Sequence, residues 1–331
     1  MDVPQATPGH SLRASIALKQ LVGTSGTFSL EISKISVVAP TNVPVLIVGE
    51  TGTGKELCAR AIHYLSKRSG GPFVPVNCGA MPTDLVENEI FGHEIGAYTG
   101  ANSRRAGMIE EAEGGTIFLD EIDSLLPVAQ SKILRFLQEG EVRRLGGVKT
   151  FKPDVRVVAA LNCDVGDALR SQCLREDLYY RLSVVQLTLP PLRDRREDIP
   201  LLAKHFVAKW NPIFGKNVLE ISPGATERLI AHDWPGNVRE LENTVARAVL
   251  FSESEVIESS QVSLLNVGDK TKGQDAQSND SNHNEKNNLE CLLKTHNGNI
   301  SHAAHATGKN RRTIQRLIQK YEIDLHEFHH H

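Results

Sequence analysis

Residues 45–56 read Val-Leu-Ile-Val-Gly-Glu-Thr-Gly-Thr-Gly-Lys-Glu, and this stretch decides the fold. The apolar run predicts a buried strand, and the residues after Lys55 predict a helix with one apolar face. A glycine-rich turn between a strand and a helix is the context of a phosphate-binding loop. There, backbone N–H groups turn inward and the helix N-terminus attracts anions. The expected nucleotide contacts are Gly49, Glu50, Thr51, Gly52, Thr53, Gly54, Lys55 and Glu56.

Four more apolar runs extend this pattern, at residues 73–76, 116–119, 155–160 and 184–187. Helical stretches separate them. Short buried strands that alternate with helices are typical of a parallel sheet covered on both faces. The sequence therefore predicts an α/β fold.

The run at 116–119 is followed by two adjacent carboxylates, Asp120 and Glu121. In open α/β sheets, ligands bind at the carboxyl ends of the strands, so both side chains are expected beside the phosphate-binding loop. Asp120 is the candidate ligand for Mg²⁺, and Glu121 is the candidate for polarising an attacking water. ATP and Mg²⁺ are the predicted cofactors. Glu56 stands where such loops usually carry a magnesium-binding hydroxyl.

Composition sets the outer bounds. Of the 331 residues, 40% are hydrophobic, which is enough for a sizeable core. The formal net charge is −3. No apolar run approaches the ~20 residues that cross a bilayer, and residues 1–12 lack a secretory pattern. The five cysteines are scattered without metal-ligand spacing, so we expect reduced thiols in a cytoplasmic protein with no membrane contact.

The organisation along the chain follows from the same patterns. A lead-in at 1–20 precedes the ATPase region at 21–191. Residues 192–264 read as helical with no clear strand, and Ser222 is a plausible N-cap. The charged run 193–198 is interpreted as a solvated connection. Residues 265–288 are polar and predict a flexible linker, and 326–331 read as a tail or tag.

A hexapeptide suggests what ATP is used for. Gly96, Ala97, Tyr98, Thr99, Gly100 and Ala101 closely match the GAFTGA loop, with Tyr98 where Phe is usual. With the two halves of the ATP site, the chain resembles, over roughly residues 20–265, the sigma-54 activator branch of the AAA+ ATPases. That resemblance implies a central phosphate-loop strand, a helical lid at 192–264, and a loop that touches sigma-54 through Thr99 and the ring at 98. It also implies that a second loop, 141–147, assists the first.

The resemblance carries over further positions one at a time. Asn77 matches the switch asparagine that holds the catalytic glutamate, and Asn162 matches a sensor position. Arg175 and Arg181 match the arginines offered to the ATP of a neighbouring subunit, and Arg239 matches the arginine of the lid. An arginine supplied in trans would make hydrolysis depend on a homo-oligomeric ring, for which a hexamer is the family expectation.

Residues 289–325 predict a DNA-binding unit. The segment 286–325 holds seven Lys or Arg against three Asp or Glu. A short helix, a turn at Gly308 and a second helix have helix-turn-helix spacing and resemble the Fis-type module of the same activators. The candidate contacts to double-stranded DNA are Lys309, Arg311, Arg312, Gln315, Arg316 and Lys320.

The leading hypothesis is an ATP-driven activator that binds upstream DNA and remodels sigma-54 RNA polymerase to the open complex. One alternative is a DNA-binding regulator that keeps the AAA+ scaffold without remodelling sigma-54. Another is a remodeller of a different protein. No sensory domain is visible in the sequence, which leaves either its removal or control by a regulatory protein in trans.

Overall fold

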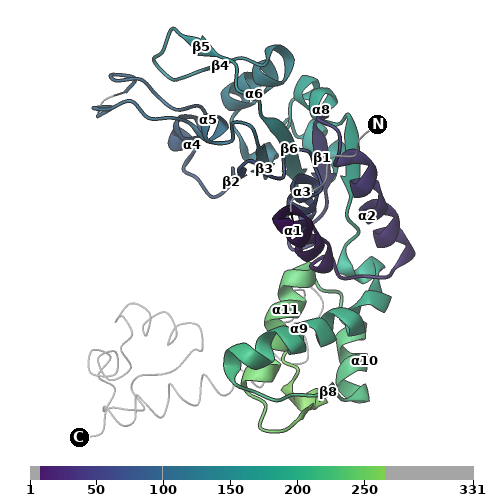
Figure 1. Ribbon diagram of the computed structural model, residues 1–331. Coiled ribbons are helices and arrows are strands. Elements are labelled where there is room, and N and C mark those ends of the chain that lie inside the picture. The colour runs from purple at the N-terminus through teal and green to yellow at the C-terminus, as the bar shows by residue number, and fades with distance from the viewer. Residues whose placement is uncertain (1–7, 99, 265–331) are drawn as a thin grey trace, which may run out of the picture. The chain divides into compact units, whose positions relative to one another are not determined.

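The computed structural model describes residues 8–98 and 100–264, all within one compact unit, Met1–Leu264. Figure 1 shows the elements of the ATPase region. Its helices are α1 Pro8–Lys19, α2 Gly26–Val38, α3 Lys55–Tyr64, α4 Thr83–Phe91, α5 Met108–Glu111, η1 Ile122–Ser124, α6 Pro127–Glu139, α7 Val165–Arg170 and α8 Glu176–Leu182. Its strands are β1 Val45–Val48, β2 Phe73–Asn77, β3 Thr116–Asp120, β4 Val142–Arg143, β5 Thr150–Phe151, β6 Arg156–Leu161 and β7 Val185–Thr188.

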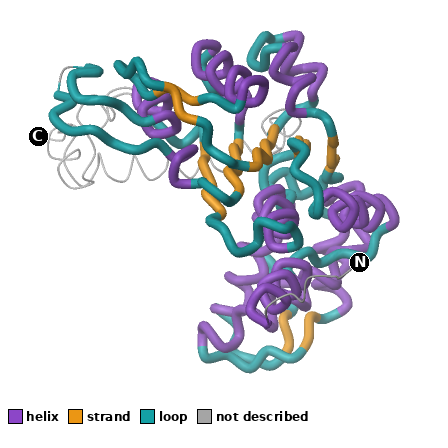
Figure 2. The backbone as a smooth tube through the Cα atoms, turned by 45° about the horizontal axis from the view of Figure 1, so that its top comes forward, coloured by secondary structure: helices purple, strands orange, loops and turns teal. Residues whose placement is uncertain are grey.

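Five of these strands form one parallel sheet in the order β2-β3-β6-β1-β7. The predicted parallel α/β sheet is therefore confirmed. The phosphate-loop strand β1 has a neighbour on each side but is not the middle strand, which is β6. The expectation of a central position for β1 was wrong by one strand. Figure 2 shows the strands in orange, and the pairs β4–β5 and β8–β9 are separate from this sheet.

Helices cover both faces of the sheet. Along β1, Leu46 and Val48 belong to one apolar cluster, with residues of α4, α5, α6 and α8. Val45 and Ile47 belong to a second cluster, with residues of α1, α2 and α3. Because side chains alternate across a strand, the two clusters lie on opposite faces. This packing fixes the carboxyl ends of β1 and β3 relative to each other.

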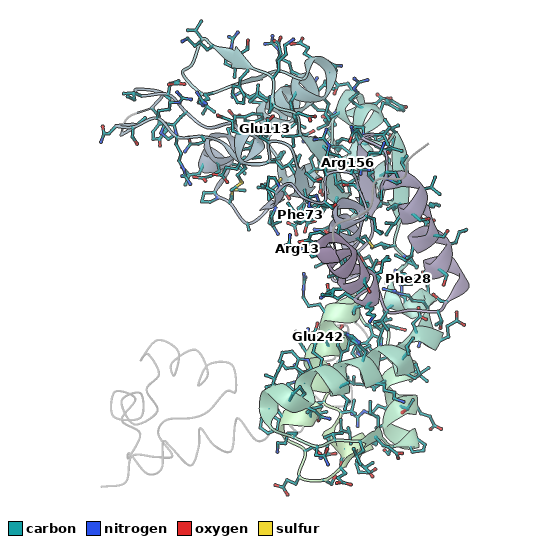
Figure 3. All side chains as sticks on the ribbon, in the orientation of Figure 1. Arg13, Phe28, Phe73, Glu113, Arg156 and Glu242 are labelled. Atoms are coloured by element: carbon teal, nitrogen blue, oxygen red, sulfur yellow. The ribbon has the colours of Figure 1, made fainter. Side chains whose placement is uncertain are left out.

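Buried Arg156 at the start of β6 anchors the end of α2 to the sheet. Its guanidinium donates to the carbonyls of Val38 and Ala39 at the end of α2, at 3.0 and 2.8 Å. Figure 3 labels Arg156 in place. Carbonyls at a helix end have no partner within the helix, and Arg156 supplies donors to these two, beside the Thr41 amide that also donates to Val38.

The lid begins after β7 with two short 3-10 turns. Its elements are η2 Leu192–Asp194, η3 Arg196–Asp198, α9 Ile199–Phe214, β8 Glu220–Ile221, α10 Pro223–Ala231, α11 Asn237–Leu250, β9 Val256–Ile257 and η4 Ser259–Gln261. Ser222 caps α10 as predicted, since its side chain accepts from the Ala225 amide. The prediction of no strand was wrong, because β8 and β9 pair in parallel over two residues each. Among the described residues, no helix has the length and apolar character needed to cross a membrane.

Candidate functional site

The phosphate-binding loop lies between β1 and α3, as the sequence predicts. Gly52 and Gly54 have φ angles of 82° and 104°, a left-handed conformation that favours glycine. Lys55 begins α3, and its Nζ donates to the carbonyls of Gly49 and Glu50 at 2.7 and 3.1 Å. Burial lowers the pKa of Lys55, and the nearby carboxylates of Asp120 and Glu121 oppose this shift.

The acidic residues stand at the carboxyl edge of the sheet beside this loop. Asp120 ends β3, and burial raises the pKa of its carboxyl group although Lys55 opposes the shift. Glu121 follows with φ 57° and ψ 48°, which a residue other than glycine seldom adopts. Its carboxylate lies close against Gly79, because a Cβ built on Gly79 would be 2.1 Å from Glu121 Oε2. Such local backbone strain is common at functional sites.

Asn77 ends β2 at the same edge. Its Oδ1 accepts from the Ala80 amide at 2.9 Å, so the side chain shapes the turn that also carries Gly79. Asn162 follows β6. A cavity of about 320 Å³ brings together most of the predicted residues, namely Thr51, Gly52, Gly54, Lys55, Glu56, Asn77, Asp120, Glu121, Asn162 and Arg239. Gly49, Glu50 and Thr53 belong to the loop without lining this cavity.

A second, more apolar cavity of about 650 Å³ adjoins the first, and sequence reasoning missed it. The two share Gly54, Leu57, Val238 and Glu242. Phe28 and Glu242, both labelled in Figure 3, line it from α2 and α11. The guanidinium of Arg195 lies 4.4 Å from the centre of the Phe28 ring. A polar, lysine-bearing cavity that continues into an apolar one suits a nucleotide with a charged phosphate end and a planar base.

The charged run 193–198 is only in part the solvated connection that the sequence predicts, because Arg193, Asp194 and Glu197 are exposed whereas two other charged side chains are buried. Arg195 is 2% exposed and Asp198 is fully buried. Asp198 Oδ1 accepts from the amides of Thr24 and Ser25 at 2.6 and 2.9 Å. Backbone amides about 170 residues earlier in the sequence thus replace water around the Asp198 carboxylate. No local pattern carries that information.

The residues present fit a magnesium ion. Mg²⁺ usually takes one or two protein carboxylates, with water and phosphate oxygens as its other ligands. Asp120 offers one partly buried carboxylate beside the phosphate-binding loop. Because burial raises the pKa of this carboxyl group, a bound cation would favour its charged form. Within the described part of the chain, no cluster of three or more His, Cys, Asp or Glu could form a cage made by protein alone.

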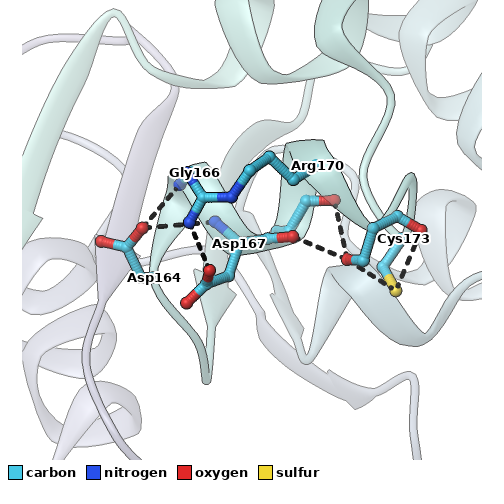
Figure 4. A network of polar contacts seen from close by, with 7 residues as sticks. Asp164, Gly166, Asp167, Arg170 and Cys173 are labelled. Carbon is cyan, nitrogen blue, oxygen red and sulfur yellow. Dashed lines mark hydrogen bonds and ion pairs between the residues drawn. The ribbon is translucent and has the colours of Figure 1, made fainter.

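The two predicted trans arginines lie on α8 and at its start, outside the cavity lining of their own subunit. Arg175 pairs with Asp177 at 2.7 Å, and Arg181 donates to the Leu137 carbonyl at 3.0 Å. Just before them, the Asp164 side chain caps α7, and Ser171 Oγ lies 3.4 Å from Cys173 Sγ in the network of polar contacts that Figure 4 shows. Both arginines are exposed. The fold therefore presents them to the outside.

The hexapeptide loop emerges between α4 and α5. Gly96 and Gly100 have φ angles of 79° and 102°, and the Gly96 amide donates to the Ala101 carbonyl at 2.9 Å. Tyr98 is 45% exposed and the neighbouring Ile95 is 70% exposed. The Tyr98 ring packs edge-on against buried His93, with 5.3 Å between the ring centroids, and the rest of it is open to solvent. Exposed apolar side chains gathered on one loop are typical of a binding surface. Thr99 lies outside the described residues.

The second predicted loop, between β4 and β5, is tied to the first through Arg144. Arg144 donates to Glu94 Oε1 at 2.8 Å and to Glu110 Oε1 at 2.7 Å. Its neighbour Leu145 accepts from the Glu94 amide at 3.0 Å. Glu94 and Glu110 flank the hexapeptide in sequence, so the hairpin holds the base of the first loop on both sides.

The remaining predicted contacts lie outside the described residues. These are the DNA-binding candidates Lys309, Arg311, Arg312, Gln315, Arg316 and Lys320. The free thiols Cys58, Cys78, Cys163 and Cys173 agree with the expected absence of disulfides in the described part, and Cys291 lies outside it.

Comparison with known proteins supports the division into a nucleotide-binding region and a lid. Residues 21–188 match a family model described as the sigma-54 interaction domain, and residues 193–279 match one described as an AAA+ ATPase lid domain. The sigma54-dependent transcriptional regulator SfnR of Pseudomonas fluorescens is 48% identical over 267 residues, which cover 81% of this chain and 73% of SfnR. The regulatory protein AtoC of Escherichia coli is 45% identical over 296 residues, covering 87% of this chain.

A solved structure agrees with these matches. NtrX from Brucella abortus in complex with ATP aligns with a TM-score of 0.70 at 33% identity, covering 95% of this chain and 73% of NtrX. The chain spans 64% of the length of AtoC, just under two thirds.

Proposed function

Because the chain belongs to the family of sigma-54-dependent transcriptional regulators, which is built on an AAA+ nucleotide-binding domain, we propose that it is an ATP-hydrolysing transcriptional activator. It binds upstream DNA and remodels sigma-54 RNA polymerase to the open complex. One observation carries the proposal. The unit that holds a phosphate-binding cavity also holds an exposed aromatic loop with a braced base.

The cavity residues have distinct roles in the proposed hydrolysis. The loop amides and Lys55 bind the phosphates of ATP. Glu121 orients and polarises the attacking water, and Asn77 sets the position of the turn against which Glu121 lies. Asp120 would hold Mg²⁺, which neutralises charge on the phosphates when bound. Asn162 and Arg239 face the same cavity and report its nucleotide state.

Arg175 and Arg181 complete the site of a neighbouring subunit. Neither lines the cavity of its own chain, and both are exposed, as a group supplied in trans must be. Arginine fingers stabilise charge on the transferring phosphoryl group and contribute roughly 10³- to 10⁵-fold in rate in other phosphate-loop enzymes. Hydrolysis then requires a ring, for which a hexamer is the family expectation.

The hexapeptide loop makes the proposed contact with sigma-54. Tyr98 supplies an aromatic ring at the tip, and Arg144 connects the base of the loop to a second hairpin. A change at the nucleotide edge of the sheet reaches this loop through α4, which follows the turn that carries Gly79. Residues 289–325 supply the DNA contacts, and a regulatory protein in trans or a sensory domain supplies the signal.

The alternative is a DNA-binding regulator with an AAA+ scaffold that leaves sigma-54 untouched. The hexapeptide loop argues against it, because such a protein would not need an exposed Tyr98 ring on a loop whose base is bonded to Arg144.

Subunit mixing tests the hydrolysis part of the proposal. Glu121→Gln and Arg181→Ala should each bind ATP and hydrolyse it poorly. Mixed rings contain interfaces that pair an intact Glu121 with an intact Arg181 from the neighbour, so mixing should restore part of the turnover. Stable mixed rings with no restored turnover would show that Arg181 does not act in trans.

A further inference from the structure

The lid binds the phosphate-binding loop directly, residue by residue. Arg193 donates to both carboxylate oxygens of Glu50 at 2.6 and 2.9 Å. The Val238 amide donates to the Gly52 carbonyl at 3.0 Å, and Arg195 donates to the Thr53 carbonyl at 3.3 Å. Three residues of the loop thus each have a partner in the lid.

Asn237 lies at the centre of these contacts. It is fully buried and has a φ of 52° at the start of α11. Its Nδ2 donates to Glu50 Oε2 and to the Thr51 carbonyl, each at 3.1 Å. Its Oδ1 accepts from the Leu192 amide at 2.8 Å. One side chain therefore joins the loop to η2 and α11 of the lid.

The direction of these bonds matters for phosphate binding. A loop that points its N–H groups inward at an anion turns its carbonyls outward, and buried carbonyls require donors. Lid groups supply donors to the carbonyls of Thr51, Gly52 and Thr53. Gly52 fits only because it lacks a side chain, since a Cβ there would lie 2.3 Å from the Gly236 carbonyl. The lid thereby fixes the inward conformation of the loop in advance.

We propose that Asn237 is a positioning residue that pre-forms the phosphate-binding loop from the lid, so that lid docking and affinity for nucleotide phosphates are coupled. This inference rests on the proposed binding of ATP at the loop. Pre-organisation raises affinity because less conformational entropy is lost on binding. The same contacts make the lid responsive to the loop, since a ligand that orders one favours docking of the other.

A merely structural role for Asn237, as a helix-start residue that stabilises the lid, makes a different prediction. It lowers the stability of the whole unit and weakens all ligands alike. A positioning role weakens binding of phosphate-bearing ligands and spares the base.

The test uses Asn237→Gly in the full chain. Glycine accepts the left-handed φ and removes only the side-chain amide. Asn217→Gly is the matched control, because Asn217 is an exposed lid asparagine. The measurements are the Kd values of ADP and of adenosine, which has no phosphates, together with the thermal unfolding midpoint.

We expect the Kd of ADP to rise roughly 10-fold or more in Asn237→Gly, from lost hydrogen bonds that include one to a charged group. The Kd of adenosine should stay near that of Asn217→Gly, whereas the unfolding midpoint should fall, because the Leu192 amide and the Thr51 carbonyl lose their hydrogen-bond partner. An unchanged Kd of ADP would overturn the inference, as would equal losses of affinity for ADP and for adenosine.

If Asn237→Gly does not fold, Asn237→Asp is made in a Glu50→Gln chain, with Glu50→Gln alone as the reference, because Asn237 Nδ2 lies 3.1 Å from the Glu50 carboxylate and two carboxylates there would repel each other. The aspartate keeps the acceptor for Leu192 but cannot donate to the Thr51 carbonyl, and ADP affinity equal to that of the reference would overturn the inference. If the native chain binds no ADP, the proposed function itself fails, which is a separate outcome.

Discussion

A methyl group added at Gly79 would move Glu121 without changing the chemistry of its carboxylate. The two residues come from different strand ends, Gly79 from the turn after β2 and Glu121 from the end of β3. A Cβ on Gly79 would lie 2.1 Å from Glu121 Oε2, whereas real Cβ contacts are essentially never under 3.0 Å. The φ of Gly79 is not in the left-handed region, so alanine fits the backbone there.

The size of the effect follows from this geometry. Since Gly79 belongs to a backbone turn, the flexible end of Glu121 is the part that yields, and it must move by about 0.9 Å. Misplacing a catalytic group by 1 Å can cost about 10²-fold in rate, or about 2.7 kcal/mol in the barrier. Binding of ATP should change little, because the loop and Lys55 are untouched.

The assay is steady-state ATP hydrolysis beside an ATP Kd, for Gly79→Ala and for Gly26→Ala as control. A Cβ on Gly26 meets no atom within 4 Å, so that variant should behave as the native chain. We expect kcat to fall by one to two orders of magnitude in Gly79→Ala only, consistent with a carboxylate about 1 Å out of place. A native kcat in a folded, ATP-binding Gly79→Ala would refute the role assigned to Glu121.

Three further outcomes are expected. Trp234→Ala should lower the free energy of unfolding by about 3–5 kcal/mol in denaturant titrations, because Trp234 is fully buried; a loss under about 1 kcal/mol would contradict its core role. Burial lowers the pKa of His63 from 6.5 to about 4, so the unfolded chain takes up the proton first and stability falls between pH 6.5 and pH 4. His63→Asn should flatten that dependence in urea titrations, and an unchanged slope would contradict it. Arg144→Ala should free the base of the hexapeptide loop and speed tryptic cleavage at the exposed Arg104 and Arg105, whereas cleavage at the native rate would argue against the brace.

The strands and the ATP cavity were predictable because their signals are local. Each apolar run lies within a residue or two of an observed strand, and the glycine-rich turn and Asp120-Glu121 occur at strand ends. The carboxyl ends of parallel strands meet at one edge, so topology alone brings these residues together. The position of β1 beside β6 rather than in the middle of the sheet depends on packing between distant segments.

What was missed depends on long-range contacts. The run at 193–198 looks solvated by composition, yet Asp198 is buried against the amides of Thr24 and Ser25. The apolar cavity draws Leu21 and Phe28 from a segment that precedes β1. Strands of two residues, such as β8 and β9, are too short to show a period.

Open-complex formation on a sigma-54 promoter tests the central claim most directly. Purified sigma-54 RNA polymerase and ATP would be combined with the full chain or with Thr99→Ala. We expect open complexes with the native chain and none with Thr99→Ala, while both hydrolyse ATP. Equal open-complex formation by both chains would contradict the role of the hexapeptide loop. None from a native chain that hydrolyses ATP and assembles would contradict sigma-54 remodelling.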